Sequence, residues 1–155
     1  DAFALESQAS CKYLAFAKQA EKEGYKQIAK LFRATAEAEA VHALSHLRVS
    51  GLVKPAEENL TKAISDETYE HTSMYPEMIK TAWKEGNKAA EKSFANASKA
   101  EEIHALLFQK ALANLTTQEE FDYYVCSTCG FTCEVAPPGK CPICGATEKA
   151  FTRIL

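Results

Sequence analysis

Apolar residues in the first 114 positions recur at intervals of three or four, which places them on one face of a helix. Ala, Glu, Lys, Leu and Gln dominate this part of the chain, and all five are good helix formers. Gly24, Gly86 and the interval from Gly51 to Pro55 interrupt the pattern. The sequence therefore predicts four helices, over residues 2–23, 25–50, 57–85 and 87–114.

Short glycine-containing connections make consecutive helices antiparallel neighbours, so the predicted fold is a mainly α four-helix bundle. We expect its core to contain the apolar stripes formed by Phe16, Ile28, Leu31, Phe32, Phe94, Leu106 and Phe108. After residue 122 glycine and proline become frequent, which is typical of turns. We predict a bundle at 1–115, a linker at 116–122 and a small domain with short β-strands at 123–155.

An internal repeat supports the bundle. Residues 20–44 and 82–106 align without a gap at an offset of 62, and 12 of the 25 aligned positions are identical. Convergent helical composition would not explain the shared Gly, Phe, Glu and His residues, so we interpret the repeat as two related helical hairpins.

Each repeat contains Glu-x-x-His, as Glu39 with His42 and as Glu101 with His104. Positions i and i+3 share a helix face, so each pair can offer an oxygen and a nitrogen to one metal ion. One such motif is weak evidence, but two at symmetric positions are not. Mixed carboxylate and imidazole ligands suit iron or manganese.

The first helix of each hairpin adds one more carboxylate. Glu6 lies 33 residues before Glu39, and Glu67 lies 34 residues before Glu101. One Glu from each of two helices, with Glu-x-x-His from each of the other two, is the pattern of ferritin-like di-iron bundles. The predicted fold is therefore ferritin-like.

Glu70 has no counterpart in the first hairpin, where Ala9 occupies the equivalent position. Four glutamates balance the charge of two Fe(II) ions, whereas two Fe(III) ions favour a fifth carboxylate. We therefore predict that Glu70 is a redox-dependent ligand. The alternative is a solvated carboxylate or one that accepts a hydrogen bond near the metal.

Glu67 and Tyr75 are eight residues apart, whereas Glu6 and Tyr13 are seven apart. Pro76 cannot donate a backbone hydrogen bond, so the extra residue predicts a π-bulge between Glu67 and Pro76. The hydroxyls of Tyr13 and Tyr75 are candidates to hydrogen-bond the ligand carboxylates. Alternatively, both tyrosines are core aromatics whose hydroxyls reach the backbone.

Cysteine is concentrated near the end of the chain. Cys126-Ser-Thr-Cys129-Gly and Cys141-Pro-Ile-Cys144-Gly predict two knuckles that hold one tetrahedral metal ion. Zinc would make the site structural and iron would make it a one-electron carrier, and spacing alone separates them poorly. Cys133 is predicted to be a free thiol outside the site, and Cys11 a small buried residue.

Thiol pairs of this kind indicate a reducing compartment, so we expect the protein to be cytoplasmic. The formal charge is −3 and no basic stretch stands out, which argues against nucleic acid as a partner. No segment is long and apolar enough to predict a membrane span.

The ordered motifs resemble those of the rubrerythrin family. They are ALESQA around Glu6, EAVH ending at His42, ETYEHTSMYPE from Glu67, EEIH ending at His104 and the two cysteine knuckles. The resemblance implies a ferritin-like bundle with a C-terminal rubredoxin-like domain, and a homodimer in which domain swapping is one arrangement. It implies the iron ligands Glu6, Glu39, His42, Glu67, Glu70, Glu101 and His104, with Glu39 and Glu101 bridging, and exchange of His42 for Glu70 on oxidation.

The same resemblance implies a peroxidase that reduces hydrogen peroxide to water in oxidative-stress defence. We expect a non-haem di-iron centre to supply two electrons to the peroxide. A single iron held by four cysteines would then reduce the di-iron centre again, one electron at a time. Rubredoxin or an NAD(P)H-dependent reductase would supply those electrons, and transfer between subunits is one route. The alternatives are a ferroxidase that uses oxygen and a non-catalytic metal-storage or zinc-ribbon protein.

Overall fold

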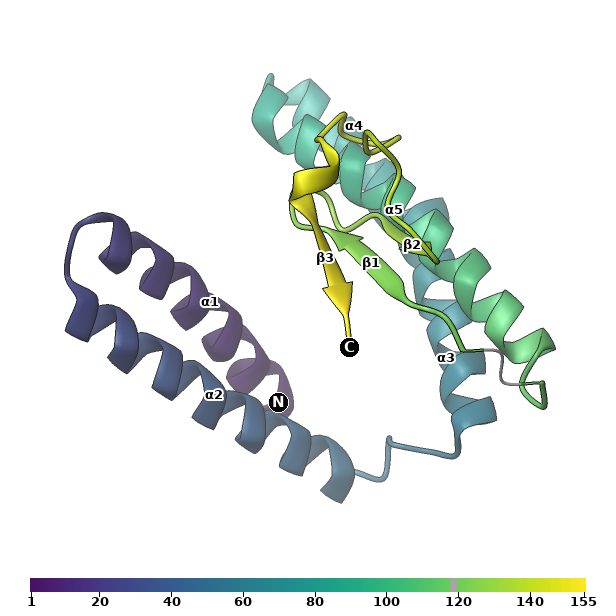
Figure 1. The fold of residues 1–155 in the computed structure, drawn as a ribbon, viewed down its shortest axis with the longest axis horizontal. Helices are drawn as coiled ribbons and strands as arrows, with labels where there is room; N and C mark the ends of the chain where they lie inside the picture. The colour runs from purple at the N-terminus through teal and green to yellow at the C-terminus, as the bar shows by residue number, and fades with distance from the viewer. Residues whose placement is uncertain (118–119) are drawn as a thin grey trace. The chain divides into compact units, whose positions relative to one another are not determined.

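The computed structural model describes residues 1–117 and 120–155 (Figure 1). Two residues of the predicted linker, 118 and 119, lie outside the described residues. The helical part consists of α1 (Ala2–Lys22), α2 (Lys26–Val49), α3 (Ala56–Tyr69), the π-helix η1 (Glu70–Met74), α4 (Tyr75–Lys84) and α5 (Lys88–Ala113). The C-terminal part consists of β1 (Tyr123–Cys126), β2 (Thr132–Glu134), the 3₁₀-helix η2 (Glu148–Ala150) and β3 (Phe151–Ile154).

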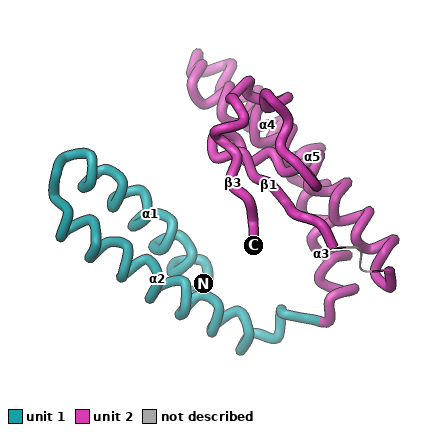
Figure 2. The backbone as a smooth tube through the Cα atoms, viewed as in Figure 1, with its two compact units in different colours: residues 1–54 teal, residues 55–155 magenta. Residues whose placement is uncertain are grey.

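The chain forms two compact units, residues 1–54 and residues 55–155 (Figure 2). The first is the hairpin of α1 and α2. The second contains α3 to α5 and the three-stranded sheet. The predicted division into a bundle at 1–115 and a small domain at 123–155 follows the motifs in the sequence rather than these compact units, and it stays a prediction.

The helices of the first hairpin meet along alanine side chains. The buried residues of this hairpin are Ala17, Ala20, Ala29, Ala36 and Ala43. Small side chains let two helix backbones approach closely. Aromatic rings add a second contact between the two helices: Tyr13 and Phe16 of α1 pack against Phe32 of α2, with ring centroids 6.0 and 5.6 Å from that of Phe32.

The turns of the two hairpins have the same geometry. The amide of Tyr25 donates to the Ala20 carbonyl at 2.8 Å, and the amide of Asn87 donates to the Ala82 carbonyl at 2.9 Å. The residues before these amides, Gly24 and Gly86, have φ of +88° and +68°, a conformation that glycine adopts without steric cost. The repeat in the sequence is thus a repeat in the backbone.

The long helix of the second hairpin is interrupted at the predicted place. Five residues, Glu70–Met74, form a π-helix between α3 and α4. Pro76 follows directly and has no amide hydrogen to continue the α-helical pattern. The prediction of a π-bulge between Glu67 and Pro76 is confirmed.

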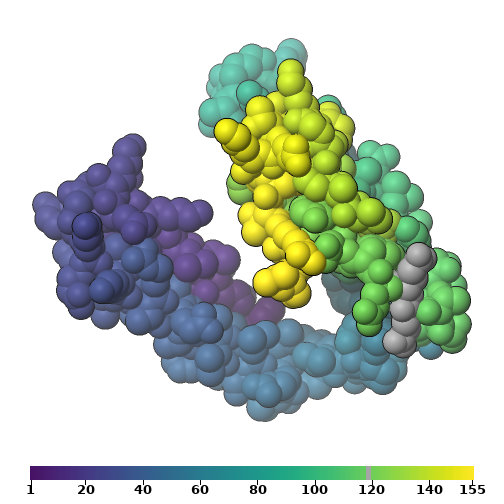
Figure 3. All heavy atoms as spheres, viewed as in Figure 1, coloured from purple at the N-terminus to yellow at the C-terminus, as the bar shows by residue number. Residues whose placement is uncertain are grey.

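The C-terminal module is a small antiparallel sheet with strand order β2-β1-β3. Tyr124 on the central strand pairs with Cys133 on one side and Arg153 on the other. Its core contains Cys126, Cys141 and Phe131, and Ile103 of α5 packs against that core. The space-filling view shows the module lying on the helices of its own unit (Figure 3).

Two predictions about burial are wrong. Phe16, Ile28, Leu31 and Leu106 of the apolar stripes are exposed, with Leu31 at 64%. In the first hairpin the reason is that alanines form the α1–α2 contact, so Phe16, Ile28 and Leu31 at other positions of the helix surface are left uncovered. Cys11 is also exposed, because it does not belong to that alanine face.

Candidate metal centres

The first hairpin brings three predicted ligands together. Glu6 of α1 and Glu39 and His42 of α2 each place one donor atom within 4.8 Å of the others. His42 Nδ1 lies 3.0 Å from a carboxylate oxygen of Glu39. The His42 side chain is 57% exposed, so the unit by itself leaves this group of donors open.

The second hairpin repeats the arrangement with the equivalent residues. Glu67 of α3 and Glu101 and His104 of α5 also place their donor atoms within 4.8 Å of one another. His104 Nδ1 lies 2.7 Å from a Glu101 oxygen and 3.7 Å from a Glu67 oxygen. The His104 side chain is 24% exposed, against 57% for His42.

Electrostatics mark the second group as a cation site. Burial, a hydrogen bond that protonated Glu67 donates to Glu101, and the charge of Glu101 raise the pKa of Glu67 to about 7, although nearby His104 lowers it. Two carboxyl groups this close share a proton because both cannot be ionised cheaply. A bound metal ion would replace that proton and satisfy both oxygens.

Glu70 and Tyr75 lie beside this group. Burial, followed by the charges of Glu101 and Asp66, raises the pKa of Glu70. Burial and the charges of Glu101, Glu70 and Glu67 raise the pKa of the Tyr75 hydroxyl. Glu70 is not among the three donors within 4.8 Å of one another, so it is a neighbour of the group in this conformation.

The two predicted tyrosines have equivalent aromatic surroundings. The Tyr75 ring lies 6.2 Å from Phe94, as the Tyr13 ring lies 6.0 Å from Phe32. These pairs match at the repeat offset. Aromatic packing holds each ring in place, and for Tyr75 the nearby carboxylates of Glu101, Glu70 and Glu67 contribute to the raised pKa of the hydroxyl.

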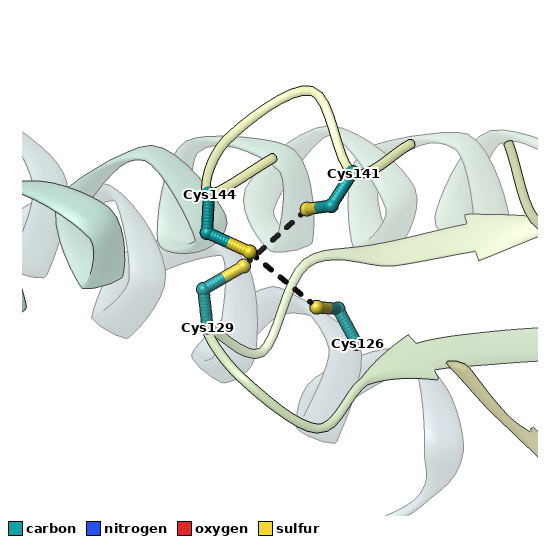
Figure 4. A group of neighbouring side chains, drawn as sticks. All are labelled: Cys126, Cys129, Cys141 and Cys144. Carbon is teal, nitrogen blue, oxygen red and sulfur yellow. Dashed lines mark hydrogen bonds between the residues drawn. The ribbon is translucent and has the colours of Figure 1, made fainter. Parts of the chain in front are cut away.

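The four cysteines of the knuckles converge on one point (Figure 4). The sulfurs of Cys126 and Cys144 are 3.7 Å apart, and those of Cys129 and Cys141 are 3.5 Å apart. A disulfide needs about 2.05 Å. A tetrahedron with metal–sulfur bonds of about 2.3 Å has edges of about 3.8 Å. The donors therefore fit one tetrahedral metal ion.

The backbone around the knuckles stabilises thiolates. Gly130 and Gly145, each directly after the second cysteine of a knuckle, have φ of +81° and +77°. Burial raises the pKa of the Cys126 thiol, but hydrogen bonds from the amides of Thr128 and Cys129 to the sulfur lower it to about 7. A thiol with this pKa releases its proton readily to a metal.

Cys133 stays outside the group of four, as predicted. Its thiol lies 3.6 Å from the Ala136 carbonyl, and burial together with the charge of Cys141 raises its pKa. A raised pKa makes this thiol a poor nucleophile.

One contact joins the two kinds of centre, and no motif in the sequence predicts it. His104 Nε2 lies 3.1 Å from the Gly130 carbonyl oxygen and 3.1 Å from the Thr132 hydroxyl. Nδ1 faces the carboxylates, so the opposite ring nitrogen donates to the cysteine module. Metal-binding histidines are commonly oriented by such a bond to a carbonyl. Gly130 and Thr132 are therefore site residues that motif spacing could not reveal.

The fold and the donor sets define the class of protein: a ferritin-like helical carboxylate protein with a rubredoxin-like four-cysteine module. The chain belongs to the rubrerythrin family, which it matches over residues 1–112. Residues 124–152 match the rubredoxin-like domain of rubrerythrin.

Similar proteins span nearly the whole chain. Nigerythrin from Nitratidesulfovibrio vulgaris is 36% identical over 165 aligned positions, which cover 97% of this chain and 82% of the relative. Rubrerythrin-2 from Clostridium acetobutylicum is 35% identical, with 97% and 91% covered. Rubrerythrin from Porphyromonas gingivalis is 34% identical, with 97% and 84% covered.

Solved structures of nigerythrin have the same fold. A partially reduced state aligns with a TM-score of 0.64 and 34% identity, covering 99% of this chain and 82% of that chain. A fully reduced, all-ferrous state also aligns with a TM-score of 0.64, covering 99% and 83%. Within the described residues, no helix of this chain is long and apolar enough to cross a membrane.

Proposed function

We propose that this protein is a non-haem di-iron peroxidase that reduces hydrogen peroxide to water in the cytoplasm. Rubrerythrin-family proteins are oxidoreductases of oxidative-stress defence. The observation that carries the proposal is the direct contact between His104, in a carboxylate group suited to iron, and the module that holds four thiolates. A site for two-electron chemistry thus adjoins a site for one-electron transfer.

The donor sets support iron in both centres. Carboxylates with imidazoles suit redox-active iron, and four thiolates suit a rubredoxin-type iron. The residues that would hold the iron pair are Glu6, Glu39, His42, Glu67, Glu101 and His104, joined by Glu70 in the oxidised state. The single iron would be held by Cys126, Cys129, Cys141 and Cys144.

When bound, two ferrous ions supply the two electrons that reduction of hydrogen peroxide requires. The protein supplies the protons. The pKa of Glu70 is raised, so its carboxyl group can hold a proton closer to neutral pH than an ordinary glutamate can. We assign Glu70 two roles, proton transfer to the departing oxygen and ligation after oxidation. We assign Tyr75, whose hydroxyl pKa is raised by burial and by the charges of the same carboxylates, the role of a hydrogen-bond donor near the substrate.

Electrons return through the cysteine module of the same chain. From Cys129 the route crosses one peptide unit to the Gly130 carbonyl, and one hydrogen bond then leads to His104 Nε2. This contact supports transfer within a chain, whereas the sequence alone also suggested transfer between subunits. A rubredoxin or an NAD(P)H-dependent reductase would reduce the module from outside.

The test compares peroxide with oxygen. Anaerobically reduced, iron-loaded protein is mixed rapidly with each oxidant while the visible thiolate-to-iron bands of the oxidised module are followed. We expect fast return of colour with peroxide and slow return with oxygen. Faster oxidation by oxygen would favour a ferroxidase, and a colourless protein would indicate zinc in the module and a non-redox role.

A matched pair of variants sharpens the test. Glu70→Gln removes the proposed proton donor, whereas Glu77→Gln changes an exposed carboxylate on the same long helix that pairs with Lys80. Slower peroxide turnover in the first variant alone supports the assignment. Equal rates in both would remove Glu70 from the mechanism.

A further inference from the structure

One face of strand β2 attaches the cysteine module to α5 within the unit of residues 55–155 (Figure 1). Alternate residues of a strand point to opposite sides, so Thr132 and Glu134 share one face and Cys133 lies on the other. Cys133 packs against the core of the module. On the opposite face, the Thr132 hydroxyl lies 3.1 Å from His104 Nε2. The Glu134 carboxylate accepts a hydrogen bond from Lys110 Nζ, which makes Lys110 a second point of attachment.

The spacing of the two contacts on the strand matches their spacing on the helix. Thr132 and Glu134 are two residues apart, which is about 7 Å along a strand. His104 and Lys110 are six residues apart, which is about 9 Å along a helix. The long, flexible lysine side chain covers the remaining difference. The two contacts therefore hold the strand along α5 at two levels.

The Lys110 ammonium contacts two segments of the module. Besides the Glu134 carboxylate, it lies 5.2 Å from the centroid of the Phe121 ring, within the range of a cation–π contact. The Phe121 ring packs against Tyr123 of β1, with centroids 5.3 Å apart. Tyr123 in turn pairs with Glu134 across the sheet. One cation thus holds the start of β1 and the end of β2 to the helix.

Close packing supports the attachment at one end only. Ile103, directly beside His104, packs against the core of the module. Towards Lys110, a cavity of about 400 Å³ separates part of the module from the helices, and its lining includes Leu107 and Tyr123. A cavity has fewer packing contacts than a close-packed interior, so it resists displacement less. The polar contacts of Lys110 therefore matter more for the placement of the module.

We propose that the ion pair of Lys110 and Glu134 positions the module for electron transfer to the carboxylate centre. It keeps the Gly130 carbonyl oxygen within 3.1 Å of His104 Nε2. A hydrogen bond of this length is lost when it is stretched by about half an ångström. Without the ion pair, the module can tilt about its attachment at Ile103 and His104, which lengthens the contact. The inference rests on the proposed function, in which electrons leave the module through this contact.

The step that depends on the contact is a one-electron transfer. The electron leaves the iron held by four thiolates, which changes from Fe(II) to Fe(III), and it reduces one Fe(III) ion of the carboxylate centre to Fe(II). No covalent bond forms or breaks in the module. Two such transfers restore the two electrons that peroxide has removed, and the external donor replaces each one.

Four variants test the ion pair. Lys110→Met keeps the apolar stem and removes the charge, and Glu134→Gln keeps the size of the side chain and removes its charge. If the two residues act through each other, the double variant is no slower than Lys110→Met alone. Arg153→Met is the matched control. Arg153 pairs with Asp122 inside the module, and its side chain is 54% exposed, as is that of Lys110.

The first measurement is the rate of internal transfer. Reduced, iron-loaded protein is mixed with peroxide, and the return of the visible thiolate-to-iron bands is followed. We expect Lys110→Met to slow this step about threefold to tenfold, the effect of losing a partly exposed ion pair and a cation–π contact. Glu134→Gln should slow it about twofold to fivefold. High salt should slow wild type but not Lys110→Met, because salt screens the ion pair.

Two controls separate positioning from damage to the centres. Arg153→Met should transfer electrons at the wild-type rate. In every variant the iron content, the visible bands and the reduction potential of the thiolate iron should equal those of wild type, because none of the substitutions touches a metal donor.

The second measurement follows the contact itself without turnover. In zinc-substituted protein, the His104 Nε2 proton is identified by nuclear magnetic resonance through its absence in His104→Gln. It should exchange slowly with water in wild type and in Arg153→Met, because it is hydrogen-bonded, and faster in Lys110→Met. An unchanged transfer rate in Lys110→Met would overturn the proposal. Slower transfer with unchanged proton exchange, or equal slowing in Arg153→Met, would overturn it too.

The choice of oxidant separates this proposal from the proposed function. If peroxide does not oxidise the reduced protein, oxygen takes its place in the same experiment. The expected order of rates among the variants then supports the positioning role, although the peroxidase assignment fails. Fast oxidation of wild type by peroxide with equal rates in all variants supports the peroxidase and overturns the positioning role.

Discussion

The proton shared in the second hairpin gives a testable dependence of stability on pH. The folded-state pKa of Glu67 is about 7, raised from 4.5 by burial and by Glu101. Between these two values the folded protein binds a proton that the unfolded chain does not. The group therefore contributes stability that is fully present below about pH 4.5 and is lost as pH rises through about 7. The perturbation that isolates it is Glu67→Gln, whose amide can still donate to Glu101 but does not titrate.

A rise of the pKa from 4.5 to about 7 corresponds to at most about 3–4 kcal/mol, at 1.36 kcal/mol for each pKa unit. The Glu67 side chain is 23% exposed, so solvent screening reduces this, and we expect about 1–2 kcal/mol. The measurement uses metal-free protein in the presence of a chelator. Between about pH 5 and about pH 8, wild type should lose about 1–2 kcal/mol of unfolding free energy relative to Glu67→Gln.

The assay is urea unfolding followed by circular dichroism at several pH values. Iron-loaded wild type serves as the control, and its loss of stability with rising pH should disappear because metal ligation requires the ionised carboxylate. Glu101→Gln should flatten the wild-type curve only in part, since it removes the charge of Glu101 but leaves the burial of Glu67, which is the largest cause of the raised pKa. Parallel curves for wild type and Glu67→Gln would show that Glu67 does not hold the proton.

Three further outcomes are expected. Glu70→Ala should slow peroxide turnover at least about 100-fold, the lower end of the range for a proton-transfer group, while the reduced protein keeps its full iron content by metal analysis. Loss of iron instead would make Glu70 a ligand in the reduced state as well. Thr132→Val should leave the iron content of the di-iron and thiolate centres unchanged. It should slow electron return to the di-iron centre a few-fold in stopped-flow measurements, because His104 loses one of its two Nε2 partners. An unchanged rate would mean that the contact with Gly130 alone couples the two centres. Iodoacetamide should modify exposed Cys11 first in metal-loaded protein and Cys133 more slowly, because the pKa of Cys133 is raised; peptide mass spectrometry showing Cys133 ahead would contradict this.

Local spacing was enough to predict the features that depend on one or two helical turns. Glu39 with His42 and Glu101 with His104 meet because residues three apart share a helix face. The π-helix could be predicted because one extra residue and Pro76 both disturb the α-helical pattern. The knuckles followed from cysteine spacing and the glycine after each pair.

Features that depend on which surfaces meet could not be predicted in this way. His104 contacts Gly130 and Thr132 because the sheet lies on α5, and no spacing relates residues 26 and 28 positions apart. The burial of alanines rather than Phe16 or Leu31 at the α1–α2 contact was missed for the same reason: both sets recur with helical periodicity, and the pattern does not say which set faces the neighbouring helix.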